Sequence, residues 1–147
     1  AEADKYIKDY LHHYSGVDGY MKSIVEKAKA DGYVSTLFGR RRYLPELSSS
    51  NGMLRSFGER VARNMPIQGT AADIIKIAMI KVYNRLKAEN LKARLLLQVH
   101  DELLIEAPQD EAGRVAQLLR DCMEHVAELS VPLVAEVKTG SSWYETK

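Results

Sequence analysis

Two adjacent acidic residues lie between apolar runs late in the chain and are the first candidates for chemistry. The runs are Ala93–Val99 and Leu103–Ala107, and His100, Asp101 and Glu102 join them. Runs this apolar are typical of buried strands, so we expect a tight turn that the sheet holds rigidly. Carboxylates fixed at such a turn suit a hard divalent cation such as Mg²⁺. Asp is also common in turns for conformational reasons alone, and the spacing leaves both interpretations open.

A second candidate group consists of Arg60, Asn64 and Gln68, which step by four along a stretch that predicts a helix. Residues four apart share one helical face. Guanidinium and amide donors on one face suit phosphate, sugar or base-edge acceptors. A solvated face with an incidental charge is the simpler interpretation of the same spacing. Further arginines that could contact phosphates, or only solvate the surface, are Arg40, Arg41, Arg42, Arg55 and Arg63.

The hydrophobic pattern predicts helices and short strands in an order typical of the α+β class. The predicted elements are helix 2–30 in one or two pieces, hairpin 33–44, helix 53–87, strands 93–99 and 103–107, helix 110–130 and strand 131–137. Pro66 lies inside the long helix and is expected to end, kink or restart it. Tyr6, Tyr10 and Tyr14, at helical spacing, are expected in the core.

Composition indicates one folded domain of 147 residues, 46% of them hydrophobic. The single cysteine, Cys122, excludes an internal disulfide and favours a reducing compartment such as the cytoplasm. Residues 1–100 carry 17 Lys and Arg against 10 Asp and Glu, whereas residues 101–147 carry 4 against 10. The basic part is compatible with a polyanionic partner. No apolar run approaches the roughly 20 residues of a membrane helix, so no membrane partner is expected.

The sequence of the acidic turn resembles a known motif. From Gln98 to Leu103 it reads Gln-Val-His-Asp-Glu-Leu, which is similar to the third conserved motif of the family A DNA polymerases, the DNA polymerase I family. Other segments resemble further parts of that family in the same order. They are 32–45, similar to the fingers hairpin, 60–76, similar to the long palm helix, and 131–133 with the Trp143 tail, similar to the closing strand and carboxyl terminus.

The resemblance implies a fold and a reaction. The fold would be a palm-type antiparallel sheet with the motif on a β-hairpin, packed on long helices, plus a helical and hairpin piece of the fingers. Residues 1–50 would belong to the fingers and residues 51–147 to the palm. The reaction would be template-directed transfer of a dNTP onto a primer 3′ end by two Mg²⁺ ions, for DNA replication and repair. The expected location is the bacterial cytoplasm, at the nucleoid through DNA.

The resemblance also assigns roles to individual residues. Asp101 would be a catalytic residue and metal ligand, and Glu102 would assist catalysis. The residues expected to contact primer–template DNA are Arg60, Asn64, Gln68, Gln98 and His100.

The chain also departs from the family pattern. Its early Asp9-Tyr10-Leu11 does not continue into the family's first catalytic motif, Asp-Tyr-Ser-Gln-Ile-Glu, and no Lys-rich nucleotide-binding helix is present. We therefore expect a carboxyl-terminal piece that needs the remainder of the polymerase chain as its partner and is inactive alone.

Two other functions remain open from the sequence. One is a stand-alone nucleic-acid-binding module without catalysis. The other is an unrelated metal hydrolase using His100, Asp101 and Glu102, which would need further ligands. His12, His13 and His125 have no ligand-like spacing to the turn.

Overall fold

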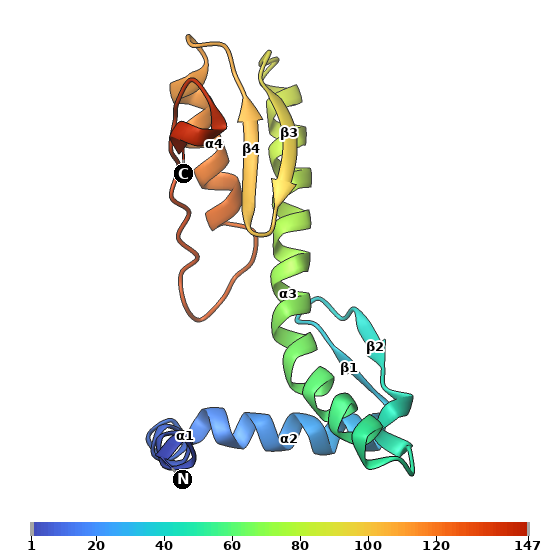
Figure 1. Cartoon of the computed structure of the whole chain (residues 1–147). Helices are drawn as coiled ribbons and strands as arrows, with labels where there is room; N and C mark the ends of the chain where they lie inside the picture. Colours follow the sequence, from blue (N-terminus) through green and yellow to red (C-terminus); the bar gives the residue numbers. More distant parts are fainter. Residues whose placement is uncertain (1, 147) are drawn as a thin grey trace. The chain divides into compact units, whose positions relative to one another are not determined.

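The computed structural model describes residues 2–146, and the chain divides into two compact units. The first unit ends at Thr70 and the second begins at Ala71, so the division falls inside the long helix α3 (Gly52–Ala88). The element order along the chain can be followed by colour in Figure 1. Helices and short antiparallel hairpins make up both units, which confirms the predicted α+β class.

The first unit combines helices with a small hairpin. Its elements are α1 (Glu2–His13), α2 (Ser15–Asp31), β1 (Tyr33–Ser35), β2 (Arg41–Tyr43), the 3-10 turn η1 (Pro45–Ser48) and the first part of α3. Helix α2 ends where Gly32 adopts a φ of +76° and its N–H donates to the Ala28 carbonyl. This left-handed conformation at a helix end is the one that glycine adopts at little cost.

A small core holds the first unit together. In the hairpin, Tyr33 pairs with Tyr43 and Val34 with Arg42, which turns Val34 toward the helices. The buried residues come from α2, the hairpin, η1 and α3, and they are Val25, Ala28, Val34, Leu44, Leu47 and Ala62. The core therefore fixes the hairpin against the amino-terminal part of α3.

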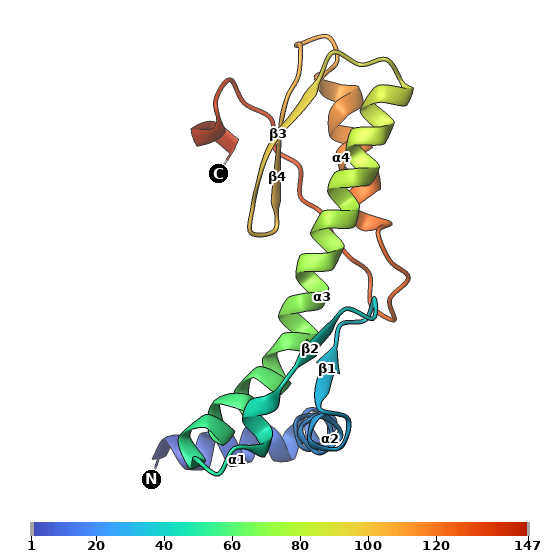
Figure 2. The same ribbon diagram turned by 90° about the vertical axis from the view of Figure 1, so that its right-hand side faces the viewer.

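The second unit packs a hairpin over two helices. Its elements are the rest of α3, β3 (Arg94–Val99), β4 (Glu102–Glu106), α4 (Ala112–Glu124) and the 3-10 turn η2 (Trp143–Thr146). Figure 2 shows the β3–β4 hairpin on one side of the helix pair formed by α4 and the end of α3. The buried core residues are Val82, Leu86, Ala93, Val115, Leu118, Leu119 and Cys122, and Leu103 and Ile105 pack against them from the hairpin.

Charged groups connect the end of α3 to α4 within this unit. Glu89 accepts hydrogen bonds from Arg114, at 2.6 and 2.7 Å, and from Arg85 at 3.1 Å. Arg85 also bonds the Asp121 carboxylate. The bonds from Arg114, with a smaller contribution from Arg85, lower the pKa of Glu89. The carboxylate of Glu111 in turn accepts the backbone N–H groups of Lys92 and Ala93, both at 3.0 Å, just before β3.

Pro66 does not end α3, which continues helically from Gly52 to Ala88. Proline in a helix interior removes one backbone hydrogen bond, here the one to the Ala62 carbonyl, and costs about 3 kcal/mol or more. Packing must therefore support the helix at this point, because the local sequence does not.

The strand predicted at residues 131–137 is wrong, because these residues form no strand in the structure. Burial does alternate: Leu133, Ala135 and Val137 are half-buried and the residues between them are exposed. A strand also needs a neighbour with which to exchange backbone hydrogen bonds. The Ala135 N–H instead donates to Glu124 Oε1 at 3.1 Å, so the alternation is present without a strand ladder. The preceding helix is also shorter than predicted, since α4 ends at Glu124.

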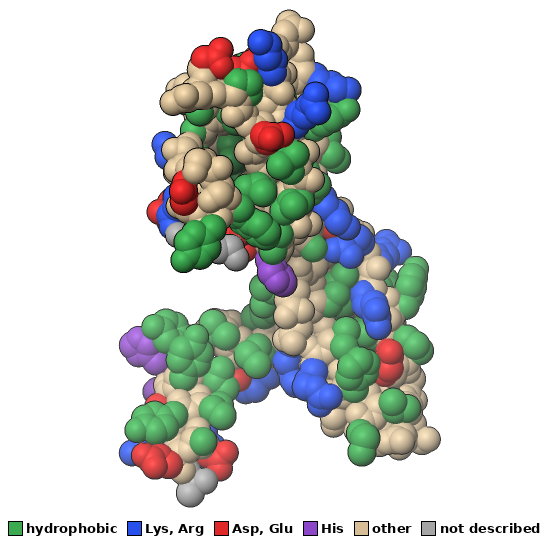
Figure 3. Space-filling view, turned by 45° about the horizontal axis from the view of Figure 1, so that its top comes forward, with side chains coloured by type: hydrophobic (Ala, Val, Ile, Leu, Met, Phe, Trp, Pro, Cys, Tyr) green, Lys and Arg blue, Asp and Glu red, His purple; other side chains and the backbone are tan. Residues whose placement is uncertain are grey.

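The prediction that the early tyrosines lie in the core is wrong. Tyr6, Tyr10 and Tyr14 are 68%, 56% and 49% exposed, and helix α1 buries no residue among those described. An apolar helical stripe is buried only where another element covers it. Figure 3 shows hydrophobic side chains gathered on the surface of this amino-terminal region. Among residues 2–146, no helix is both long enough and apolar enough to cross a membrane.

Candidate functional site

The acidic turn is built by the β3–β4 hairpin. Val99 pairs with Glu102, which leaves His100 and Asp101 as a two-residue turn, so Glu102 begins the second strand. His100 has a φ of +52°, an uncommon conformation for a residue with a side chain. Such conformations persist only where the surroundings impose them, and they cluster at functional sites. The hairpin thus holds the turn in one defined backbone shape.

Gln98 braces the turn from the end of β3. Its side-chain amide Nε2 donates a hydrogen bond to the carbonyl oxygen of His100, with a distance of 2.5 Å between the two atoms. The bond fixes the carbonyl of the residue that carries the positive φ. The second amide hydrogen and the side-chain carbonyl oxygen of Gln98 are still available to another partner, because this side chain is exposed.

The carboxylates of Asp101 and Glu102 are exposed at the tip of the hairpin. Within residues 2–146, neither carboxylate makes a hydrogen bond or ion pair to another described residue. Free carboxylate oxygens on a turn of defined backbone shape fit Mg²⁺, which is often bound through one or two carboxylates plus water and substrate phosphates. The described residues hold no group of three or more His, Cys, Asp or Glu side chains that could bind a metal ion. The turn therefore fits part of a metal site.

The second predicted group lies in the first unit. Arg60, Asn64 and Gln68 are all exposed on α3, one helical turn apart, as their spacing predicts. The Arg60 guanidinium carbon lies 5.9 Å from the centre of the Phe57 ring, at the outer limit of a cation–π contact. Among the described residues, Asn64 and Gln68 have no side-chain hydrogen bond. The face therefore presents donors that are available to a ligand.

Most of the other arginines have partners within the protein. Arg55 donates to the carbonyl oxygens of Ser49 and Ser50, both at 2.9 Å, and so shapes the loop before α3. Arg63 lies 3.5 Å from Glu59, and Arg41 stacks 4.5 Å from the Tyr33 ring centre. Arg40 bonds the Gly69 carbonyl. These side chains shape the unit, which distinguishes them from Arg60.

The structure assembles each group within its own unit. Gln98, His100, Asp101 and Glu102 meet at one turn in the second unit, and the helix face lies in the first. The positive φ of His100 and the bond from Gln98 to its carbonyl were not predicted from the sequence. The short connection of three polar residues between apolar runs is the one signal in the sequence for a special turn conformation there.

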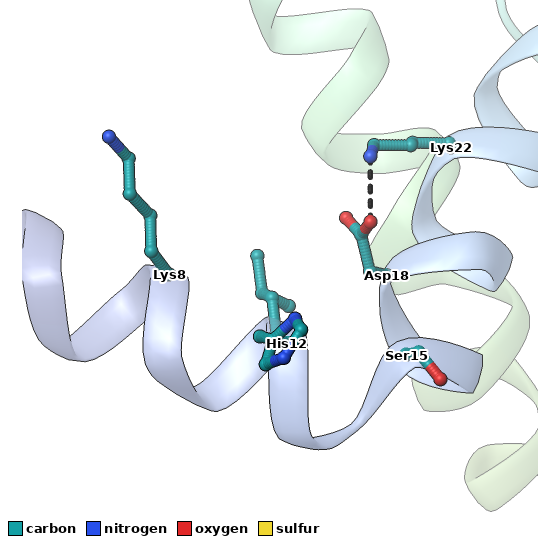
Figure 4. A pocket seen from close by; sticks show the side chains of 6 residues that line it. Lys8, His12, Ser15, Asp18 and Lys22 are labelled. Atoms are coloured by element: carbon teal, nitrogen blue, oxygen red, sulfur yellow. Dashed lines mark hydrogen bonds and ion pairs between the residues drawn. The ribbon is translucent and has the colours of Figure 1, made fainter.

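A shallow hollow of about 380 Å³ lies between α1 and α2 in the first unit, and none of the predicted site residues lines it. Figure 4 shows Lys8, His12 and Ser15 on its sides and the ion pair between Lys22 and Asp18, whose atoms are 2.6 Å apart. The ion pair neutralises the charge of the half-buried Asp18, so the hollow gathers no set of groups suited to catalysis.

Comparisons with known proteins cover nearly the whole chain. Residues 1–145 match the family described as DNA polymerase family A. Among curated relatives, the chain is 53% identical to DNA polymerase I of Bacillus caldotenax and 51% identical to that of Caldicellulosiruptor bescii. Each match covers 99% of this chain and 17% of the relative. DNA polymerase I of Deinococcus radiodurans is 52% identical over all of this chain and 15% of its own length.

A solved structure gives the same result. The POL domain of Pol1 from M. smegmatis, in complex with DNA primer-template and dNTP, matches with a TM-score of 0.96 and 49% identity. The match covers 99% of this chain and 26% of that one, so the chain spans a minor part of each protein that it resembles. The order of motifs, the hairpin that carries the acidic turn and these matches agree, and the chain belongs to DNA polymerase family A.

Proposed function

We propose that these residues form part of a DNA-directed DNA polymerase that adds dNTPs to the 3′ end of a primer. The observation that carries the proposal is the match of 99% of the chain, at 49% identity, to a polymerase domain in complex with primer-template and dNTP. The turn supports it, because it presents Asp101 without a competing partner among the described residues. Such a protein acts where the chromosome is, in the bacterial cytoplasm.

In this proposal, Asp101 supplies oxygen ligands to a Mg²⁺ site that other parts of the polymerase complete. Two bound metal ions in such sites activate the attacking hydroxyl and stabilise the leaving oxygen. Glu102 follows directly and adds negative charge beside Asp101, so it assists. Gln98 holds the backbone of the turn through the His100 carbonyl, and His100 reaches the primer end from its exposed position.

The exposed face of α3 binds primer–template DNA in the same proposal. Arg60, Asn64 and Gln68 present donors, and every base pair presents acceptors in the minor groove at purine N3 or pyrimidine O2. Donors that use only these acceptors detect the shape of a pair without reading its sequence. A copying enzyme needs this combination, because it must accept every template and still reject misshapen pairs.

The proposal also divides the chain and names its partner. Residues 1–50 are assigned to the fingers and residues 51–147 to the palm, and the partner is the remainder of a polymerase chain. The turn offers only part of a metal site within residues 2–146. We therefore expect the 147 residues alone to extend no primer.

Primer extension tests the proposal in two stages. The 147-residue chain, once a cooperative melt shows that it is folded, is incubated with primer–template, Mg²⁺ and four dNTPs, and no extension is expected. The second protein is a chimeric polymerase, meaning the Bacillus caldotenax relative with its matching segment replaced by this chain, and it should extend the primer. Extension by the chain alone that Asp101→Asn abolishes would contradict the need for a partner. A chimeric polymerase that binds DNA without incorporating nucleotides would identify a binding module instead.

A further inference from the structure

The loop between β1 and β2 is attached to α3 at the turn that follows Pro66. The Leu37 N–H donates to Thr70 Oγ1 at 2.9 Å, and Arg40 Nη2 donates to the Gly69 carbonyl at 3.0 Å. Both bonds join residues about 30 positions apart, and both lie inside the first unit. The loop therefore forms hydrogen bonds with two consecutive residues of the helix, Gly69 and Thr70.

Gly69 is the residue that allows this close approach. A Cβ atom at position 69 would lie 2.7 Å from Cγ2 of Thr36, a distance that real Cβ atoms essentially never show. Thr36 cannot easily move aside, because it is 5% exposed. Its hydroxyl also accepts the Arg40 N–H, and its backbone N–H donates to the Arg40 carbonyl. Internal hydrogen bonds thus brace the loop, which packs against α3 at the one residue of the contact that lacks a side chain, Gly69, and bonds the side chain of the next residue, Thr70.

The helix needs support at this position. Pro66 cannot donate the backbone bond of a helix interior, and Gly69 weakens a helix through its conformational freedom. Thr70 contributes a further local bond, because its hydroxyl donates to the Pro66 carbonyl at 2.5 Å while accepting from Leu37. The loop contacts therefore fall where the sequence itself least favours a helix.

The supported turn is also the one that carries Gln68. At 100° per residue, Gly69 and Thr70 project from a different side of the helix than Asn64 and Gln68. The loop consequently leaves Gln68 exposed while it holds the two residues that follow it, and the bond from Thr70 to the Pro66 carbonyl closes the turn around it. A helix that frayed here would displace Gln68 directly.

We propose that the β1–β2 loop is a positioning clamp. Its contacts, of Thr36 with Gly69 and of Leu37 with Thr70, hold the Pro66–Thr70 turn of α3 helical, so that Gln68 meets primer–template DNA in a fixed orientation. The inference rests on the proposed function, because it assumes that Gln68 contacts DNA. Thr36, Gly69 and Thr70 are positioning residues that act through Gln68.

The first test replaces the Thr70 hydroxyl in the chimeric polymerase. Thr70→Val keeps the shape and removes the bonds to Leu37 and Pro66, whereas Thr70→Ser keeps the hydroxyl. We expect Thr70→Val to lower discrimination against extending a mismatched primer end by up to about tenfold, the effect of losing the one bond that joins the loop to the helix, from Leu37. The KM for dNTP should not change, and Thr70→Ser should restore discrimination. Equal discrimination in the Val and Ser variants would overturn the clamp.

The second test introduces the steric clash and then relieves it. Gly69→Ala should lower thermal stability and mismatch discrimination, although alanine normally favours a helix over glycine. Adding Thr36→Ser removes the Cγ2 methyl group that the new Cβ would meet and should restore both. The matched control is Gly19→Ala in α2, where a Cβ would meet nothing within 4 Å. A Gly69→Ala variant that Thr36→Ser does not rescue would contradict the inference.

A double-mutant comparison separates this inference from the proposed function. Gln68→Ala should itself reduce mismatch discrimination, and Thr70→Val should then add little in that background, since both act at the same contact. If Gln68→Ala has no effect, the DNA contact of Gln68 is wrong and the clamp falls with it. If Gln68→Ala impairs discrimination and Thr70→Val adds its full effect independently, only the clamp is wrong.

Discussion

Arg60 and Arg63 lie three residues apart on α3 and have different surroundings. Arg63 is ion-paired with Glu59, at 3.5 Å, whereas among residues 2–146 the one partner of the Arg60 guanidinium is the Phe57 ring, at 5.9 Å. A guanidinium already paired with a carboxylate has less to gain from a phosphate. The sequence alone did not separate the two, because both read as exposed helical arginines.

This difference predicts the effects of removing each arginine on DNA binding. Arg60→Ala in the chimeric polymerase should weaken primer–template binding and reduce the slope of log affinity against log salt by about one, if Arg60 contacts a phosphate. Arg63→Ala is the matched control and should leave that slope unchanged. The measurement is a salt titration of DNA affinity, and equal slopes in the wild-type and Arg60→Ala proteins would exclude a phosphate contact.

At the scale of elements, the sequence predicts what local pattern decides and misses what a neighbour decides. The β3–β4 hairpin is found almost where expected, since two apolar runs flank a short polar connection. The sequence predicts a helix over 53–87 but leaves open whether Pro66 ends, kinks or restarts it, because the loop that contacts the turn after Pro66 lies about 30 residues earlier. The alternation at 131–137 reflects burial alone, and no pattern within a segment shows whether another strand will pair with it.

The link between α3 and α4 makes a prediction about pH. Hydrogen bonds from Arg114, and then Arg85, lower the pKa of Glu89 below its ordinary value of 4.5. Because the pKa is lower in the folded chain than in the unfolded chain, the ionised carboxylate stabilises the fold at any pH above the ordinary pKa. This stabilisation is lost as the pH falls through the lowered pKa of the folded chain. Glu89→Gln should therefore lower the melting temperature at pH 7. The difference in melting temperature between this variant and the wild type should become smaller in acid.

Thermal melts of the wild-type chain and of Glu89→Gln, from pH 7 down to about pH 3, check this expectation. Glu128→Gln is the control, since Glu128 is exposed and makes no hydrogen bond or ion pair to the described residues. A constant difference between wild type and Glu89→Gln across that range would mean that the carboxylate charge is not what connects the helices.

For the molecule as a whole, spacing identified each group of candidate residues but did not connect them. The acidic turn and the helix face lie in different compact units, and periodicity describes each separately. The matches over nearly the whole chain place both groups in one polymerase family, and a shared DNA substrate for them is part of the proposed function. The matched relatives are several times longer, since the chain covers 17% of the Caldicellulosiruptor bescii protein, and the proposal assigns completion of the metal site to the remainder of such a chain.

The uncovered apolar surface is a property of the same scale. Helix α1 buries nothing among the described residues, and Leu96 and Leu97 of β3 are 52% and 40% exposed. Exposed apolar groups of this kind are typical of surfaces that meet another body of protein. They agree with the proposal that the remainder of a polymerase chain is the partner.

The role of Asp101 is tested most directly by the rate of single-nucleotide incorporation in the chimeric polymerase, measured together with primer–template affinity. Asp101→Asn should reduce incorporation to background and leave affinity within a few-fold, because in the proposed function the side chain is a ligand of the metal and not of the DNA. Asp110→Asn changes another exposed turn aspartate, after β4, and should preserve both quantities. Normal incorporation by Asp101→Asn, or a loss of DNA affinity as large as the loss of rate, would contradict the assignment of Asp101 as a metal ligand.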